Sequence, residues 1–371
     1  MTGTLEPRPL NPYASQPDRA FWKRSVANRH ANEINELFRG IGGLENSKLA
    51  TAGSCFAQHL GKALKSRGLL YMDYEPPPPF LISRSRADDP LPPFATDGDI
   101  GQFGYGLFSC RYGNIYSVRQ LKQLLEEAFG LRQPVESIWM KSGRYYDALR
   151  PSIEPEGFNS REQVIALRKS HISRVRALFS DLDVLVFTLG LTETWASTKD
   201  GTAFPIAPGV IAGEFKDSDY QLKNFRYNEI YDDMAAFITA LRTINPSAKL
   251  LLTVSPVPLA ATATDQHVLV ATTYSKSVLR SVAGDLAEDI DGVDYFPSFE
   301  IITGQPSRHM YYNPDLRTVR QAGVTEVMRH FFGDQAEPQA LKATDIASVT
   351  DGPRSIAGFE HCDESRLENA K

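Results

Sequence analysis

The sequence predicts an α/β fold with three α/β/α layers, a parallel sheet and insertions. Two apolar runs, 183–189 and 249–254, have the composition of strands that are buried on both faces. Segments with the 3.6-residue spacing of amphipathic helices alternate with these runs. Such alternation is typical of parallel sheets, because two parallel strands need a crossover connection between them.

Individual elements can be placed to within about two to four residues. The expected strands are 48–51, 183–189, 249–254 and 293–296. The expected helices are 56–67, 118–129, 160–179, 227–244, 271–286 and 322–332. Ser160, with Gln163 three residues later, resembles the capping box that begins many helices.

The α/β domain is expected over residues 46–333, with a segment on either side of it. Residues 1–45 form an N-terminal extension that we expect to pack on the core through its aromatic side chains, Tyr13, Phe21, Trp22 and Phe38. The tail, 334–371, is polar towards its end and is expected to be loosely ordered. Within the domain, 75–106 is rich in Pro, Gly and Asp, which predicts a long loop or lid.

Composition narrows the classes of partner. A net charge of -5 and a pI near 5.9 give no basic surface field, so we expect no nucleic acid partner and favour a small-molecule or carbohydrate substrate. The three cysteines, Cys55, Cys110 and Cys362, are scattered, which disfavours a disulfide framework and a zinc site. No phosphate-binding glycine pattern is present, and no cofactor is expected.

The chain is expected to be cytoplasmic. Pro and charged residues fill 1–24, where a signal peptide needs an apolar stretch. No window approaches the roughly 18 apolar residues that a membrane helix requires.

Ser54 is the first candidate for chemistry. It follows a predicted strand and Gly53, and it begins a predicted helix whose N–H groups could stabilise an oxyanion. The alternative is that Ser54 is only the N-cap of that helix, a position where Ser is common. Cys55 is a rival nucleophile, although a buried apolar role suits it better. His59 lies too far round the helix to contact Ser54 easily.

Residues 51–57, Thr-Ala-Gly-Ser-Cys-Phe-Ala, contain the five residues that name the GSCFA family. Further segments that resemble this family are 113–116, 188–195, 253–257, 275–276 and 295–300. The chain therefore resembles the GSCFA family, a bacterial group similar to the SGNH or GDSL-like hydrolases.

The resemblance implies a flavodoxin-like fold in which Ser54 attacks an ester carbonyl. It places oxyanion donors at Gly53 and the backbone around Ser54, and at Gly113 or Asn114 in a second block. Where SGNH enzymes present a Gly and an Asn, this chain has Gly190 and Thr192, and a hydroxyl can still donate a hydrogen bond. Glu193 in the same turn either orients a loop or a histidine or is a structural carboxylate.

One departure concerns the general base, which a serine nucleophile needs. Related hydrolases place an Asp-x-x-His pair before the last helix, and here Asp315 is followed by Thr318. His267 and His309, both in loops, are the candidate bases, with His267 slightly favoured.

Two acids and three further side chains complete the candidates. Asp315 and Glu300 are the candidates to orient the imidazole, with capping as the alternative for Asp315. Arg308, Arg317 and Tyr312 either bind a polar or anionic substrate or pack at the rim of the site.

The sequence therefore predicts a serine esterase or O-acyltransferase that acts on acetyl esters, most reasonably of a carbohydrate, through an acyl-enzyme on Ser54. The alternative is a carbohydrate-binding or scaffold protein without activity on a hydrolase fold.

Overall fold

A central parallel sheet organises the protein. The computed structural model describes residues 11–38, 40, 44–79, 101–333 and 363–369. Its sheet has the order β1-β4-β8-β9 and every neighbouring pair is parallel. The strands are β1 (Leu49–Gly53), β4 (Val184–Leu189), β8 (Lys249–Val254) and β9 (Val293–Phe296). The prediction of an α/β fold with a parallel sheet is confirmed.

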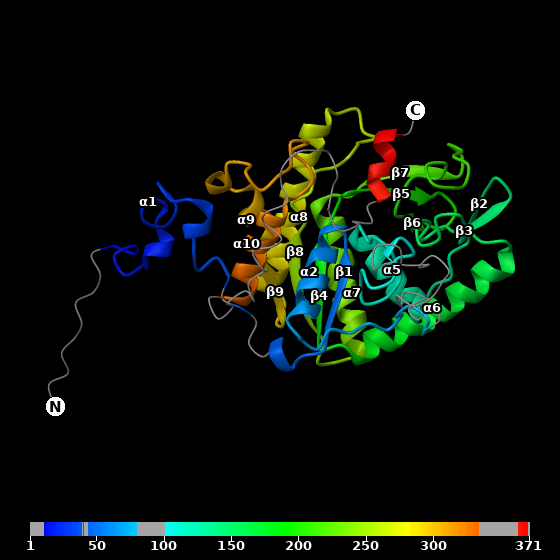
Figure 1. Cartoon of the computed structure of the whole chain (residues 1–371), viewed down its shortest axis with the longest axis horizontal. Coiled ribbons are helices and arrows are strands. Elements are labelled where there is room, and N and C mark those ends of the chain that lie inside the picture. The colour runs from blue at the N-terminus through cyan, green and yellow to red at the C-terminus, as the bar shows by residue number, and fades with distance from the viewer. Residues whose placement is uncertain (1–10, 39, 41–43, 80–100, 334–362, 370–371) are drawn as a thin grey trace, which may run out of the picture.

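Helices cover both faces of this sheet (Figure 1). One face packs on helices α5 (Val118–Ala128), α6 (Arg161–Asp181), α7 (Tyr227–Ile244) and α8 (Val268–Asp289). The other face packs on α2 (Phe56–Ser66), α9 (Ser298–Thr303) and α10 (Gln321–Phe332). Alternate residues of one strand point to opposite faces, so Leu185 and Phe187 of β4 join the first core and Val184 and Val186 join the second. All six predicted helices and all four predicted strands are thereby confirmed within about four residues.

Five strands outside the central sheet were not predicted. They are β2 (Ile138–Lys141), β3 (Arg144–Asp147), β5 (Glu193–Ser197), β6 (Ala203–Phe204) and β7 (Tyr220–Asn224). They form an antiparallel hairpin, β2-β3, and an antiparallel sheet, β6-β5-β7. A small core joins them around Trp139, Phe204 and Tyr220. These strands are short and several of their residues are exposed, so no apolar run marks them in the sequence.

The N-terminal extension contacts the domain through Ala31, Phe38 and Leu44 and through hydrogen bonds that Ile34 and Asn35 accept from Arg329. It contains η1 (Asp18–Ala20), α1 (Trp22–Ser25), η2 (Ala31–Glu33) and η3 (Leu44–Asn46). Phe38 packs edge-on against Phe296 and stacks on Phe331, as expected. Tyr13 and Trp22 are 68% and 60% exposed, so the expectation that they pack on the core is wrong.

The remaining described elements lie near the carboxyl ends of the strands or in the tail. They are η4 (Gln305–Ser307) and η6 (Asp363–Asn369). Within the tail, Asp363 and Glu364 are buried and Leu367 contacts the small core of the antiparallel sheet. Most of the predicted lid, residues 80–100, lies outside the described residues. No helix in the described ranges is long and apolar enough to cross a membrane.

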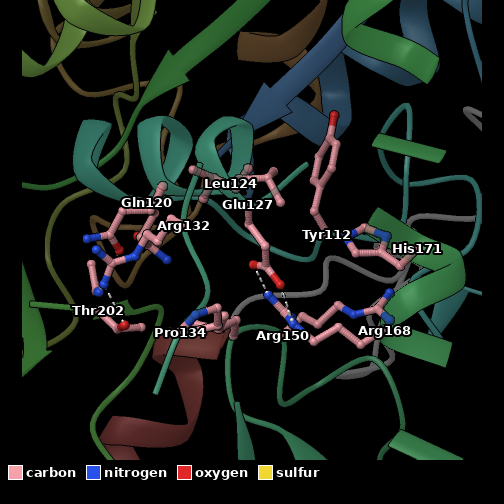
Figure 2. Close-up of a pocket in the computed structure, with 14 residues that line it drawn as sticks. Tyr112, Gln120, Leu124, Glu127, Arg132, Pro134, Arg150, Arg168, His171 and Thr202 are labelled. Atoms are coloured by element: carbon pink, nitrogen blue, oxygen red, sulfur yellow. Dashed lines mark hydrogen bonds and ion pairs between the residues drawn. The ribbon is translucent and has the colours of Figure 1, made fainter. Parts of the chain in front are cut away.

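A buried ionic network around Asp147 fixes the hairpin to the helical layer. Figure 2 shows the part of this network that joins Glu127 to Arg168. Arg150 Nε and Arg168 Nη1 donate to Asp147 at 2.7 and 2.8 Å, and Arg168 Nε donates to Glu127 at 2.9 Å. Burial raises the pKa of Asp147, but Arg168 and Arg150 outweigh this effect and lower it to about 2. The adjoining cavity has a volume of about 40 Å³, which is room for water but not for a substrate.

We predict that Asp147→Asn lowers the free energy of unfolding by about 3 kcal/mol, because two buried guanidinium groups lose their carboxylate. Urea unfolding at neutral pH measures this change. Asp18→Asn, which breaks an exposed ion pair with Arg24, serves as the control and should change stability by less than about 0.5 kcal/mol. Equal effects of the two substitutions would contradict the structural role of the network.

Candidate active site

Ser54 lies between β1 and α2 with an unsatisfied hydroxyl. The residue is only 3% exposed, and Ser54 Oγ forms no hydrogen bond with any residue in the described ranges. The N-cap of α2 is Cys55, so the alternative that Ser54 caps this helix is wrong. A buried hydroxyl without a partner costs about 1–3 kcal/mol, a cost typical of groups that serve a function.

Gly53 allows β1 and β4 to approach closely at their carboxyl ends. Its φ of +137° is rare for other residues, and a Cβ at this position would lie 2.4 Å from Thr188 O. Ser54 N–H donates to the same Thr188 O at 3.3 Å. Because this N–H already has an acceptor, the predicted backbone oxyanion donors around Ser54 would be N–H groups of the residues that follow it.

Hydrogen bonds join three loops around Ser54. Ile115 N–H donates to Gly53 O at 2.8 Å, and Gly190 N–H donates to Tyr116 O at 3.1 Å. A Cβ on Gly190 would lie 3.1 Å from both Ser54 Cβ and Tyr116 O. The structure thus brings together the segments 53–54, 113–116 and 190–192, which are far apart in the sequence.

Two predicted oxyanion donors are buried in these loops. Asn114 Nδ2 donates to Asp363 Oδ2 at 3.0 Å, so a carboxylate oxygen already lies on this donor. Thr192 N–H donates to Ser275 Oγ at 3.1 Å, whereas Thr192 Oγ1 has no partner among the described residues. Gly113, with φ +68°, forms the turn that presents Asn114. Both side chains have the chemistry that an oxyanion requires.

Glu193 orients a loop. Its two carboxylate oxygens accept from Thr262 Oγ1 at 2.6 Å and from Ala263 N–H at 3.2 Å. These bonds hold the loop that follows β8. The turn at 190–193 is thereby connected to a further loop at the same edge of the sheet.

Lys276 of α8 is the functional candidate that sequence reasoning missed. It is 3% exposed, and its Nζ donates at 2.7 Å to the O atom of Gly190, a residue that adjoins Ser54. Lys276 Nζ forms no hydrogen bond with Ser54 Oγ. Its pKa is lowered to about 8, mainly by burial and also by Arg317, although Glu364 and Cys55 partly offset this effect. The sequence could have indicated this residue, because Lys276 is a charged residue on the face of α8 that also carries Ser275, Leu279 and other buried residues.

An apolar cavity adjoins these loops. Its volume is about 130 Å³. It is lined by residues of the 191–195 turn, of β6 and β7, of the 259–263 loop and of η6, including Leu191, Trp195, Phe204, Leu222, Leu259 and Leu367. A small acyl group or part of a larger ligand would fit there.

The family model of the GSCFA family matches residues 48–331 of the chain. The chain belongs to the GSCFA family. No curated protein matches the sequence. The family match contains Ser54, Asn114, Lys276 and Arg317, whereas the tail residues Asp363 and Glu364 lie outside it.

The two predicted general bases of this GSCFA protein do not contact the serine. His267 is the N-cap of α8, and its Nδ1 accepts from Leu269 N–H at 3.2 Å. His309 is exposed, and its ring centroid lies 6.5 Å from that of Tyr312. Neither forms a hydrogen bond with Ser54 Oγ, and their catalytic roles remain predictions.

The two predicted acids have other partners. Asp315 accepts from Arg317 N–H and Thr318 N–H, at 2.9 and 3.0 Å, within a turn. The next described helix, α10, has Arg320 as its N-cap, so the alternative that Asp315 caps a helix is wrong. Partial burial raises the pKa of Asp315, but these hydrogen bonds bring it below its ordinary value. Glu300 accepts from Arg280 Nε and from Tyr295 OH. Neither acid is hydrogen-bonded to His267 or His309.

The three predicted substrate-binding side chains are separated by the fold. Arg308 is exposed, and its backbone is left-handed with φ 45°. Tyr312 OH donates to Pro256 O at 2.6 Å and supports the loop after β8. Arg317 is turned towards the buried Glu364, which accepts from its Nη2 at 3.1 Å. Arg317 alone of the three lies beside the loops of the candidate site.

We predict that Gly53→Ala lowers the free energy of unfolding by at least about 2 kcal/mol, because it combines backbone strain with a backbone clash. Gly130→Ala is the matched control, since Gly130 has φ +73° but open space around its Cβ position. It should cost only about 1 kcal/mol. Chemical denaturation compares the two, and an equal loss would show that the approach to Thr188 is not limiting.

Proposed function

We propose that this protein is a serine esterase or O-acyltransferase of the SGNH-like kind, with Ser54 as its nucleophile. The observation that carries the proposal is the buried Ser54 hydroxyl, which has no hydrogen-bond partner among the described residues. It lies at the carboxyl end of a parallel strand, where ligands bind in open α/β sheets. Ser54 Oγ attacks the acyl carbonyl, and the acyl-enzyme is then resolved by water or by a hydroxyl of an acceptor such as a carbohydrate.

Asn114 Nδ2 and Thr192 Oγ1 supply the oxyanion hydrogen bonds. Asn114 Nδ2 already donates to a carboxylate oxygen, which has the charge that the carbonyl oxygen acquires in the transition state. Thr192 Oγ1 is buried and has no partner in the described part of the chain. Both groups can therefore donate a hydrogen bond to an oxygen atom of a ligand.

Lys276 is the proton acceptor that we propose in place of a histidine. A serine paired with a lysine is a known variant of the catalytic triad. The neutral amine takes the Ser54 Oγ proton as the new ester bond forms and returns it to the departing alkoxide. A pKa of about 8 is suitable for both transfers near neutral pH. In the second half of the reaction, Lys276 accepts a proton from water or from the acceptor hydroxyl and returns it to Ser54.

The apolar cavity of about 130 Å³ supports a short acyl chain such as acetyl. Leu191, which lines this cavity together with Glu193, Glu364 and apolar residues, follows Gly190 in the loop beside Ser54, and we therefore assign the cavity to the acyl substituent. The chromogenic ester 4-nitrophenyl acetate is therefore a suitable first substrate.

We predict that Ser54→Ala reduces kcat on 4-nitrophenyl acetate by at least about 10³-fold, because the nucleophile is lost. Release of 4-nitrophenolate measures the rate. Circular dichroism and thermal unfolding check that the variant folds. Equal turnover by the wild type and the alanine variant would contradict Ser54 as the nucleophile. A wild-type rate no higher than the uncatalysed rate would support the alternative, a carbohydrate-binding or scaffold protein without activity.

We predict that kcat/KM rises with pH around a midpoint near 8, since deprotonation of Lys276 creates the base. The titratable groups that act on Lys276 are Glu364, Cys55 and Arg317. Lys276→Met should lower kcat by about 10²-fold or more and remove this rise.

His267→Ala and His309→Ala test the two sequence predictions in the same assay. If either substitution abolishes the pH-dependent rise while Lys276→Met retains it, the histidine is the base and the assignment to Lys276 fails.

A further inference from the structure

A carboxylate of the tail is buried among positive groups at the candidate site. Glu364 accepts from Arg317 Nη2 at 3.1 Å, with the two side chains 8% and 13% exposed. Burial raises the pKa of Glu364, and Arg317, the charge of Lys276 and a hydrogen bond from Ala260 N–H offset this effect only in part. Arg317 Nε donates to Pro258 O at 3.2 Å, which fixes the guanidinium towards this position.

These positive groups and the carboxylate come from different parts of the chain. Arg317, Lys276 and Ala260 lie within the residues that match the GSCFA family, 48–331, and Glu364 does not. Residues 334–362 separate η6 from the end of the domain. The positive groups thus belong to the domain, and the anion is brought to them by the tail.

Two buried cations require an anion. Arg317 lowers the pKa of Lys276, the effect of a nearby like charge, whereas Glu364 raises it. If Glu364 left, the buried guanidinium would lose the carboxylate that it hydrogen-bonds, which is unfavourable even though the charge of Asp315 also acts on Arg317. A ligand that takes the place of the tail therefore has to bring a negative charge.

The neighbouring tail residue accepts a hydrogen bond from the proposed oxyanion donor. Asp363 Oδ2 lies on Asn114 Nδ2, the proposed oxyanion donor. The carboxylate of Asp363 thus lies on the proposed oxyanion donor, and the carboxylate of the next residue, Glu364, lies on the positive groups beside it. The spacing of one residue fits an ester that carries its own carboxylate a few bonds from the carbonyl.

We propose that Arg317, with the Ala260 N–H and the charge of Lys276, forms a subsite for a carboxylate group of the substrate, and that Glu364 is its occupant within the same chain. The inference rests on the proposed function in one respect, namely that Ser54 acts on the same ligand. The substrate class is an acyl ester of a carboxylate-bearing alcohol, such as an O-acetylated hydroxy acid or uronic acid. Such a substrate displaces Asp363 and Glu364 together.

The test compares 4-acetoxybenzoate with its methyl ester, which differ in the carboxylate charge. In the full-length protein, kcat/KM for the anionic ester should exceed that for the methyl ester by at least about tenfold, the value of one charge-assisted hydrogen bond. Arg317→Gln should bring the ratio close to one. Arg308→Gln, which removes an exposed arginine of the same region, should retain the ratio. Equal kcat/KM values for the two esters in the wild type overturn the subsite.

Binding separates this inference from the proposed function. Isothermal titration of 4-acetoxybenzoate into full-length Ser54→Ala should show binding. Adding Arg317→Gln to this variant should weaken the binding about tenfold or more. Adding Glu364→Gln should strengthen it, because the internal competitor loses its charge. Arg317-dependent binding without hydrolysis by the wild type refutes the serine esterase and leaves the subsite standing. Binding that is indifferent to both Arg317→Gln and Glu364→Gln refutes the subsite.

Discussion

The close approach of β1 and β4 at their carboxyl ends is the constraint on which the candidate site depends. Gly53 has no Cβ to collide with Thr188 O, and Gly190 has none to collide with Ser54 Cβ or Tyr116 O. Backbone hydrogen bonds then join the 113–116 segment to both strands. Ser54 is consequently positioned by backbone rather than by a capping bond of its own, and its hydroxyl remains available.

Buried charge has two different roles in this protein. Around Asp147, each carboxylate and each guanidinium group has an oppositely charged partner in the hairpin or in the helices that pack on it. These ion pairs have a structural role. Beside Ser54, Arg317 and Lys276 belong to the domain, and the carboxylate that neutralises them comes from the tail. The first network is closed within the domain, whereas the second can exchange its anion for that of a ligand.

Lys276 connects the chemistry to the subsite. Its amine holds Gly190 O, and its pKa of about 8 already includes the effect of a carboxylate at the Glu364 position. A substrate carboxylate in the same place would keep that pKa in the range suited to a general base. One lysine can therefore respond to the substrate charge and still accept the Ser54 proton.

The sequence by itself determined the parallel sheet, the six main helices and the position of Ser54 after β1, because apolar period and the glycine turn are local signals. It named Asn114, Gly190 and Thr192 through the family resemblance. Only the tertiary structure decided that β5, β6 and β7 form a sheet, that Lys276 lies beside Gly190, and that Glu364 reaches Arg317. These features depend on contacts between residues far apart in the chain. Burial and pKa follow from such contacts, so no local pattern encodes them.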